Sequence, residues 1–272
     1  MRLVSIHIYP MKAARAVDLD ESRVEPWGLA GDRRWLLIEL DGKFVTQRQE
    51  PSVARVVVRY VPGGLGGIEV SADGGPPLAI PAPDPERGAE MVWVNVWASK
   101  VRAAAAGPAA DKWFSSFLCR PLRLVYLDDP TRRQVDPDFG HPDDRVSFAD
   151  GFPLLLTTVR SLEALNDWLI EDQSEPVPMN RFRPSAVVAG TPAWAEDGWH
   201  RVRLGPVTFR VANPCGRCQI ITTDQFTGER GREPLMMLGR RRKFGQQLVF
   251  GQDLIPDGTG TIRVGDELEI LE

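Results

Sequence analysis

Residues 213–224 read Asn213-Pro214-Cys215-Gly216-Arg217-Cys218-Gln219-Ile220-Ile221-Thr222-Thr223-Asp224 and contain two of the three cysteines of the chain. They follow the stretch 207–211, whose alternation of apolar and polar residues predicts a β-strand. Pro214 has no amide donor and Gly216 permits tight backbone geometry, so we expect the two thiols to lie on a shaped loop. Arg217, between them, is expected to lower the pKa of a neighbouring thiol and to favour the thiolate.

A thiolate in this position could act as a ligand to a soft metal, as one half of a redox pair or as a nucleophile. The alternative is that both cysteines only pack in the protein interior and have no chemical role. Zinc would need two further ligands. Cys119 lies far upstream, where we expect a buried and inert thiol, and the three histidines are scattered at His7, His141 and His200. A thioredoxin-type pair is expected early, in a strand–helix–strand unit. The residues therefore favour one cysteine as ligand to a soft transition metal.

Composition indicates an ordinary globular protein. The 272 residues are 43% hydrophobic and 26% charged, the net charge is −4, and 25 Gly and 23 Pro fit many turns between short strands. This charge does not suggest nucleic acid or an anionic membrane as a partner. An odd number of cysteines suggests a reducing compartment, and neither a membrane span nor a signal peptide is recognisable. We expect a cytoplasmic protein.

Short strands broken by Gly and Pro indicate an antiparallel barrel or sandwich. Three stretches show helical spacing, and the segment 128–145 is predicted to be a loop. The glycine-rich run 63–67 is predicted to be a flexible turn. The predicted strands are 4–8, 53–61, 68–70, 78–80, 91–97 and 122–127, and the predicted helices are 111–119, 161–170 and 233–242.

The cysteine motif, with Thr227-Gly228 after it, resembles the signature of the MOSC-domain family, most closely its amidoxime-reducing branch. Members of that branch bind the molybdenum cofactor (Mo-molybdopterin). The second cysteine of the motif ligates molybdenum there, and this role falls on Cys218 here. The resemblance implies a mostly β protein with a few helices, an N-terminal β-barrel-like domain over residues 1–106 and a C-terminal MOSC β-barrel over residues 107–272.

Other family motifs imply further site residues. The stretch Tyr9-Pro10-Met11-Lys12 matches a family motif at Lys12, although Ala13 replaces a serine. The turn Asp32-Arg33-Arg34-Trp35 matches the family's Asp-Arg-x-Trp, whose arginine holds the phosphate region of the cofactor, and this role falls on Arg33. Phe182-Arg183-Pro184-Ser185 matches at Arg183, with Ser185 in place of an asparagine. Asp150 fits an aspartate near the metal, while Gly151 and Phe152 replace hydroxyl residues. The implied cofactor-binding residues are Lys12, Arg33, Arg183, Ser185, Arg217 and Cys218, and the implied catalytic residues are Cys218 and Asp150.

The implied reaction is two-electron reduction of N-hydroxylated compounds such as amidoximes, hydroxylamines and N-hydroxylated bases. No Gly-x-Gly-x-x-Gly turn between strand and helix offers a nicotinamide site, and three cysteines cannot hold an iron–sulfur cluster as well. A separate ferredoxin- or cytochrome-type protein is therefore expected to deliver the electrons. The second interpretation is a carrier that holds molybdenum cofactor or a persulfide sulfur on Cys218, as in the cofactor sulfurases. A purely structural β-domain is the third.

Overall fold

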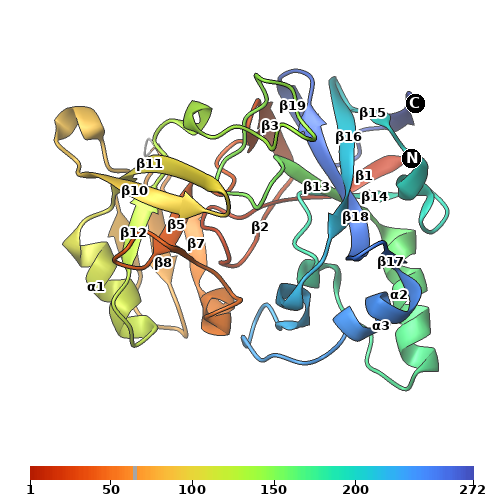
Figure 1. The fold of residues 1–272 in the computed structure, drawn as a ribbon, viewed down its shortest axis with the longest axis horizontal. Coiled ribbons are helices and arrows are strands. Elements are labelled where there is room, and N and C mark those ends of the chain that lie inside the picture. The colour runs from red at the N-terminus through yellow and green to blue at the C-terminus, as the bar shows by residue number, and fades with distance from the viewer. Residues whose placement is uncertain (64–65) are drawn as a thin grey trace.

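The computed structural model describes residues 1–63 and 66–272, and the chain forms two β-rich halves that lie side by side (Figure 1). Strands dominate, and three α-helices occur in the described residues. This confirms the predicted fold class, mostly β with a few helices. The predicted turn at 63–67 falls partly outside the described residues, because 64 and 65 are not among them.

The larger sheet has nine strands, and all its pairs are antiparallel except β13 with β14. It contains the first strand of the chain as well as most strands after residue 150. In spatial order its strands are β2 (Val17–Leu19), β1 (Arg2–Ile8), β14 (Ala186–Ala189), β13 (Leu154–Thr158), β18 (Gln247–Pro256), β16 (Val207–Gly216), β15 (Arg201–Leu204) and β20 (Leu268–Ile270), with β17 (Lys243–Phe244) beside β18.

Three smaller sheets complete the β structure. The five-stranded sheet is β10 (Met91–Val96), β11 (Ser99–Ala105), β12 (Arg123–Tyr126), β5 (Trp35–Ile38) and β6 (Phe44–Val45). The two three-stranded sheets are β7 (Val57–Tyr60), β8 (Ile68–Ser71) and β9 (Leu78–Ile80), and β19 (Gly260–Arg263), β3 (Glu21–Glu25) and β4 (Gly28–Leu29). Because β1 and β3 pair with strands of the second half, the chain crosses between the halves more than once. The division at residues 106 and 107 stays a prediction.

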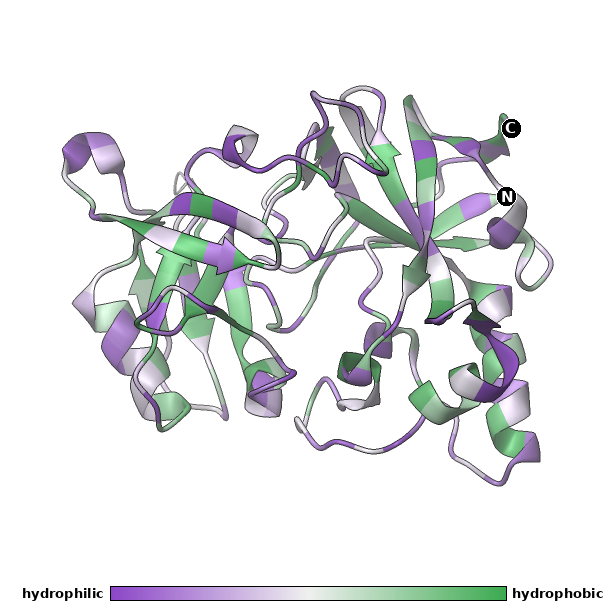
Figure 2. Ribbon diagram, viewed as in Figure 1, coloured by the Kyte–Doolittle hydropathy of each residue, from purple (hydrophilic) through white to green (hydrophobic). Residues whose placement is uncertain are grey.

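Each half has its own hydrophobic core. One core lies on the larger sheet around Leu3, Phe209 and Leu254, and the other around Trp35, Phe114 and Leu124. Apolar residues run along the strands of both halves, while most connecting loops are hydrophilic (Figure 2). Burial of these alternating apolar side chains is the main source of stability for such sheets.

The predicted helices are confirmed as α1 (Pro108–Phe117), α2 (Val159–Glu171) and α3 (Leu235–Arg241). α2 begins after Thr158, whose hydroxyl accepts a hydrogen bond from the amide of Ser161. Leu165 and Leu169, four residues apart, are buried on its inner face. No helix of the described ranges combines the length and the apolar character that crossing a membrane requires. The short 3-10 helices are η1 (Pro51–Arg55), η2 (Pro85–Arg87), η3 (Pro130–Arg132), η4 (Met179–Arg181), η5 (Ala195–Gly198) and η6 (Gln219–Thr222).

Three local predictions were wrong. The strand predicted at 53–61 begins only at Val57, because residues 51–55 form η1 with local bonds from Val53 to Glu50 and from Val56 to Val53. Cys119 is exposed rather than buried, since α1 ends at Phe117 and the chain turns away through a positive φ of 53°.

The third error concerns the cysteine motif. Cys215 lies within β16, which runs through to Gly216, and is therefore not on a loop. Pro214 is tolerated because the ladder with β15 ends at Arg210 and the ladder with β18 is irregular on both sides of Pro214. Cys218 lies beyond the strand, immediately before η6.

A reciprocal pair of amides joins the halves. Gln47 Nε2 donates to Gln225 Oε1 at 2.9 Å, and Gln225 Nε2 donates to Gln47 Oε1 at 3.0 Å. Both side chains are buried, and Gln225 Oε1 also accepts from Arg183 Nη1 at 2.9 Å. A buried amide left without its partner costs more than the paired bond contributes.

We predict that Gln225→Ala lowers the free energy of unfolding by about 1–3 kcal/mol, because it leaves buried atoms of Gln47 and Arg183 without partners. Denaturant unfolding followed by circular dichroism measures the loss. Gln246→Ala, at an exposed glutamine, is the matched control and is expected to change stability by less than about 0.5 kcal/mol. The double variant Gln47→Ala/Gln225→Ala should lose less than the sum of the single changes. Strict additivity would contradict the pairing.

Candidate functional site

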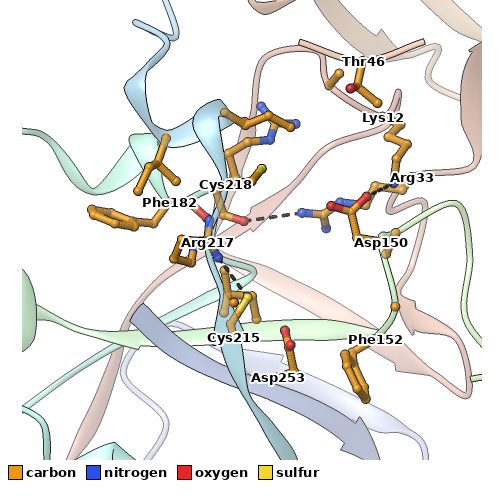
Figure 3. A pocket seen from close by; sticks show the side chains of 18 of the residues that line it. Lys12, Arg33, Thr46, Asp150, Phe152, Phe182, Cys215, Arg217, Cys218 and Asp253 are labelled. Carbon is orange, nitrogen blue, oxygen red and sulfur yellow. Dashed lines mark hydrogen bonds and ion pairs between the residues drawn. The ribbon is translucent and has the colours of Figure 1, made fainter. Parts of the chain in front are cut away.

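A cavity of about 310 Å³ lies where several distant segments of the chain meet. Figure 3 shows its labelled side chains converging from opposite walls. The cysteine motif supplies one wall, and segments near residues 12, 33 and 48 supply another. The lining residues used below are Lys12, Ala13, Arg33, Thr46, Arg48, Asp150, Phe152, Phe182, Arg183, Cys215, Arg217, Cys218 and Asp253.

Arg217 holds the motif in shape. Its backbone amide donates to the carbonyl of Leu248 at 2.6 Å, which keeps the chain beside β18 after β16 ends. Its Nη1 donates to Cys215 Sγ at 3.0 Å and its Nη2 donates to the carbonyl of Phe182 at 2.7 Å. The guanidinium is therefore committed to Cys215 and to the neighbouring loop, while the thiol of Cys218 lines the cavity.

Arg217 lowers the pKa of the Cys215 thiol as expected, but it does not make the thiolate the favoured form. Burial, with the carboxyl of Asp253 adding to it, raises the pKa of the Cys215 thiol well above its ordinary value, and Arg217 does not offset this. Asp253 lies on β18 opposite Asn213 of β16. Burial raises the pKa of Asp253 to about 7, although Cys215 and Arg217 both act in the other direction.

Lys12 and Asp150 form an ion pair at the cavity wall. Lys12 Nζ lies 2.6 Å from Asp150 Oδ1 and also donates to the carbonyl of Phe148 at 2.6 Å. Burial lowers the pKa of Lys12 to about 8, against the attraction of Asp150. Desolvation by the surrounding protein raises the pKa of the Asp150 carboxyl. The positive charges of Lys12 and Arg48 outweigh this effect and hold the pKa far below its usual range. Both members of the pair are thus charged at neutral pH.

Two guanidiniums lie close to the ring of Tyr9. Arg33 lies 4.4 Å and Arg183 lies 4.2 Å from the ring centroid. Arg33 forms an ion pair with the buried carboxylate of Asp32 and donates to the carbonyl of Arg183 at 3.4 Å. Burial lowers the pKa of Arg183 to about 10, so this group also keeps its charge at neutral pH.

Lys12, Arg33, Arg48 and Arg183 form a cationic wall of the cavity, and not all of its donors have a partner in the described part of the chain. Nη2 of Arg183 and Nη1 of Arg48 are buried and have no hydrogen-bond partner among the described residues. Buried charged donors are normally paired, so two free donors on one wall indicate an anionic ligand. The wall suits a phosphate or a similarly charged group.

The backbone at this wall is strained. Ala13, Arg33 and Arg183 have φ values of 70°, 48° and 56°, in the region that residues with a Cβ rarely adopt. Each such residue costs on the order of 1–3 kcal/mol. Non-glycine strain of this kind concentrates at functional sites, which agrees with the position of all three at the cavity.

Of the predicted site residues, Lys12, Arg33, Asp150, Arg183, Arg217 and Cys218 all line this one cavity. Ser185 does not. It is fully buried outside the cavity lining, and its hydroxyl accepts a hydrogen bond from the amide of Leu155 at 3.3 Å. Ala13 contributes backbone and a methyl group but no hydroxyl.

Asp253, Thr46 and Arg48 also line the cavity, and none of them is among the site residues predicted above. In the sequence, Asp253 stands out only as the single carboxylate within the mostly apolar residues of β18. Arg48 pairs with Asp150 at 3.4 Å and lies 4.7 Å from the ring centroid of Trp97. Glu50, two residues after Arg48, pairs with Arg120 at 2.8 Å and does not line the cavity.

Comparisons with known proteins identify the family. Residues 1–121 match the MOSC N-terminal beta barrel domain, and residues 143–269 match the MOSC domain. The chain is 31% identical over 286 residues to human mitochondrial amidoxime-reducing component 1, covering 99% of this chain and 82% of that protein. The chain belongs to the MOSC family.

Two further relatives are an amidoxime-reducing component and a molybdenum cofactor sulfurase. The MOSC protein described here is 31% identical to amidoxime-reducing component 1 of Xenopus laevis, over 95% of this chain and 79% of that protein. It is 26% identical to the molybdenum cofactor sulfurase of Bos taurus, over 91% of this chain but only 30% of that protein. The match to the sulfurase therefore concerns one part of a longer chain.

No group of three or more His, Cys, Asp or Glu side chains suited to a metal ion occurs in residues 1–63 and 66–272. A metal at this cavity would therefore need ligands of its own beside the thiols of Cys215 and Cys218. A soft thiol beside cations with free donors fits an anionic cofactor that carries its own metal.

We predict that Cys215 is alkylated by iodoacetamide at pH 8 about tenfold or more slowly than the exposed Cys119, because the thiolate reacts and the raised pKa keeps Cys215 protonated. Asp253→Asn removes a charge that raises this pKa and should accelerate the reaction of Cys215 only. The measurement is a time course by peptide mass spectrometry on cofactor-free protein. Asp20→Asn, at an exposed carboxylate, serves as control. An unchanged Cys215 rate in Asp253→Asn would contradict the coupling.

Proposed function

We propose that this chain binds molybdenum cofactor in the 310 Å³ cavity and reduces N-hydroxylated compounds there. One observation carries the proposal: the thiol of Cys218 shares the cavity with a cationic wall in which Arg183 and Arg48 have buried donors without partners. The names of the relatives support it, since amidoxime-reducing components and molybdenum cofactor sulfurases both match nearly the whole chain.

The residues divide the binding between them. Lys12, Arg33 and Arg183 would hold the anionic end of the cofactor by charge-assisted hydrogen bonds, and Cys218 would supply the thiolate ligand. When bound, the cofactor supplies the two-electron redox chemistry. Asp150 fixes the position of Lys12 and Arg48, so its role in this proposal is to arrange the wall.

Reduction of an N–OH group to N–H releases water and consumes two protons. Two cavity side chains can hold and release a proton near neutral pH: Asp253, with a pKa of about 7, and Lys12, with a pKa of about 8. Asp150 remains ionised and cannot do so. Phe152 and Phe182 give the cavity an apolar side that limits the entry of water.

Electrons would come from a separate ferredoxin- or cytochrome-type protein, and this partner and a small N-hydroxylated substrate stay predictions. The cytoplasmic location also stays a prediction, and the amidoxime-reducing relatives are named as mitochondrial.

The match to the molybdenum cofactor sulfurases favours a second candidate, a carrier that holds the cofactor or a persulfide sulfur on Cys218. A carrier and a reductase would use the same cavity and the same thiol. They differ in turnover, because a carrier binds and releases its cargo without reducing an amidoxime.

We predict that purified protein contains molybdenum and pterin near one per chain and reduces benzamidoxime with a reduced viologen dye. Cys218→Ser should abolish the reduction, because a hydroxyl is a harder and less acidic ligand than a thiol. Cys215→Ser should keep most of it, since Cys215 is protonated and bonded to Arg217. Elemental analysis, pterin fluorescence and dye oxidation are the measurements.

The outcomes separate the candidates. Molybdenum and pterin without turnover would support the carrier. Equal loss of activity in both cysteine variants would refute the single-ligand assignment. Turnover with NADH and no second protein would show that the separate electron donor was wrongly proposed.

We predict that Arg33→Ala and Arg183→Ala give folded protein that is poor in molybdenum. Each charged hydrogen bond contributes about 1.5–3 kcal/mol, equivalent to roughly a tenfold or greater loss of cofactor affinity. Metal content per chain after gel filtration measures this, and circular dichroism checks folding. Arg160→Ala, at an exposed arginine of α2, is the matched control. Full occupancy in both site variants would show that other residues hold the cofactor.

A further inference from the structure

A second cavity, of about 490 Å³, lies on the outer side of β1, away from the core residues Leu3, Ile6 and Ile8. Arg183 lines both this cavity and the cofactor cavity. Its other lining residues come from β1 and β2, from α2 and β14, and from the loops near residues 15, 180 and 226. The proposed cofactor chemistry uses none of them.

Three of these residues form a hydrogen-bonded row. Ser5 and His7 are two residues apart on β1 and so point to one face, and Asp18 of β2 is the cross-strand partner of His7. His7 Nδ1 lies 2.7 Å from Asp18 Oδ1, and His7 Nε2 lies 2.9 Å from Ser5 Oγ. An ionised carboxylate only accepts, so Nδ1 carries the proton; in neutral His7 the other nitrogen then accepts from the Ser5 hydroxyl.

This is the arrangement in which a carboxylate orients an imidazole that acts as base toward a serine. The cavity also offers groups for a developing negative charge. Asn180 Oδ1 is buried and has no hydrogen-bond partner among the described residues. If the side-chain amide of Asn180 is rotated by half a turn, its NH₂ group takes the position of Oδ1 and can donate hydrogen bonds to an anion. The guanidinium of Arg15 lines the same space.

One side of the cavity is apolar, and the cavity opens to solvent. Val159, Leu162, Met179, Pro184 and Val187 form its apolar side, while Val4 and Phe226 are 42% and 59% exposed. Such a lining takes an alkyl or aryl group and leaves the polar end of a ligand at the serine. An ester with a small apolar acyl group has both parts.

We propose that Ser5, His7 and Asp18 form a hydrolytic centre for carboxylic esters with a small apolar acyl group. Ser5 Oγ attacks the carbonyl carbon while His7 Nε2 takes the hydroxyl proton. The ester C–O bond breaks, and His7 returns that proton to the departing alcohol. Water then attacks the acyl group on Ser5 with His7 as base, which releases the carboxylic acid and restores the serine. Asp18 acts as a positioning residue for His7.

Cofactor-free protein tests this centre, so its failure is distinguishable from failure of the proposed reductase. The protein should hydrolyse p-nitrophenyl butyrate, and a fluorophosphonate probe should label the peptide that contains Ser5, as seen by mass spectrometry. Ser5→Ala and His7→Gln should lower kcat/KM for the ester by at least about 100-fold. The exposed controls His141→Gln and Ser116→Ala should not change it.

Asp18 is tested by conservative rescue. Asp18→Asn should lower kcat for the ester, whereas Asp18→Glu should retain a substantial part of the wild-type kcat. A purely structural role of this exposed residue would not produce that difference between the two variants. Circular dichroism of each variant confirms folding. Hydrolysis that survives Ser5→Ala, or a probe bound only at other residues, would overturn the proposal. So would hydrolysis that His141→Gln reduces as strongly as His7→Gln.

Discussion

The buried ion pair of Asp32 and Arg33 is the interaction on which the site depends. Asp32 is 1% exposed and accepts a hydrogen bond from the amide of Tyr9 at 2.7 Å, while Arg33 reaches the carbonyl of Arg183. The hydroxyl of Tyr9 donates to the carbonyl of Pro184 at 3.1 Å. Three distant segments thus meet around one pair of charges. Removing one partner of such a pair typically costs about 3–5 kcal/mol, because the other charge is left buried and alone.

The same wall combines strain, like charges and donors without partners, none of which stabilises the fold. Arg33 and Arg183 both lie close to the ring of Tyr9, and each has a positive φ. Proteins carry such conflicts where a ligand resolves them. The hydrophobic cores of the two halves and the Gln47–Gln225 pair hold the wall in this state. Arg33 and Arg183 belong both to the proposed site and to the contacts that stabilise the fold, through Asp32 and Gln225 respectively.

Much of the fold could be read from local patterns. The strand in residues 4–8 and the helices at 111–119 and 161–170 follow from periods of two and 3.6 residues, which depend only on neighbours in the chain. The prediction for residues 53–61 was wrong because an apolar run does not distinguish a strand from a tight 3-10 turn. The irregular ladder that admits Pro214 into β16 depends on the partner strand β18, and no local pattern shows it.

The chemical types at the site follow from the sequence: the paired cysteines, the arginines and lysine of separate motifs, and the carboxylate of Asp150. Their distances and contacts follow only from the fold. Folding places the Arg217 guanidinium on Cys215, leaves Ser185 outside the cavity lining, and brings Asp253 in through the pairing of β16 with β18. It also sets His7 against Asp18 through the pairing of β1 with β2. The reason is physical: side-chain chemistry belongs to each residue, whereas distance, burial and pKa shifts arise from segments that only folding brings together.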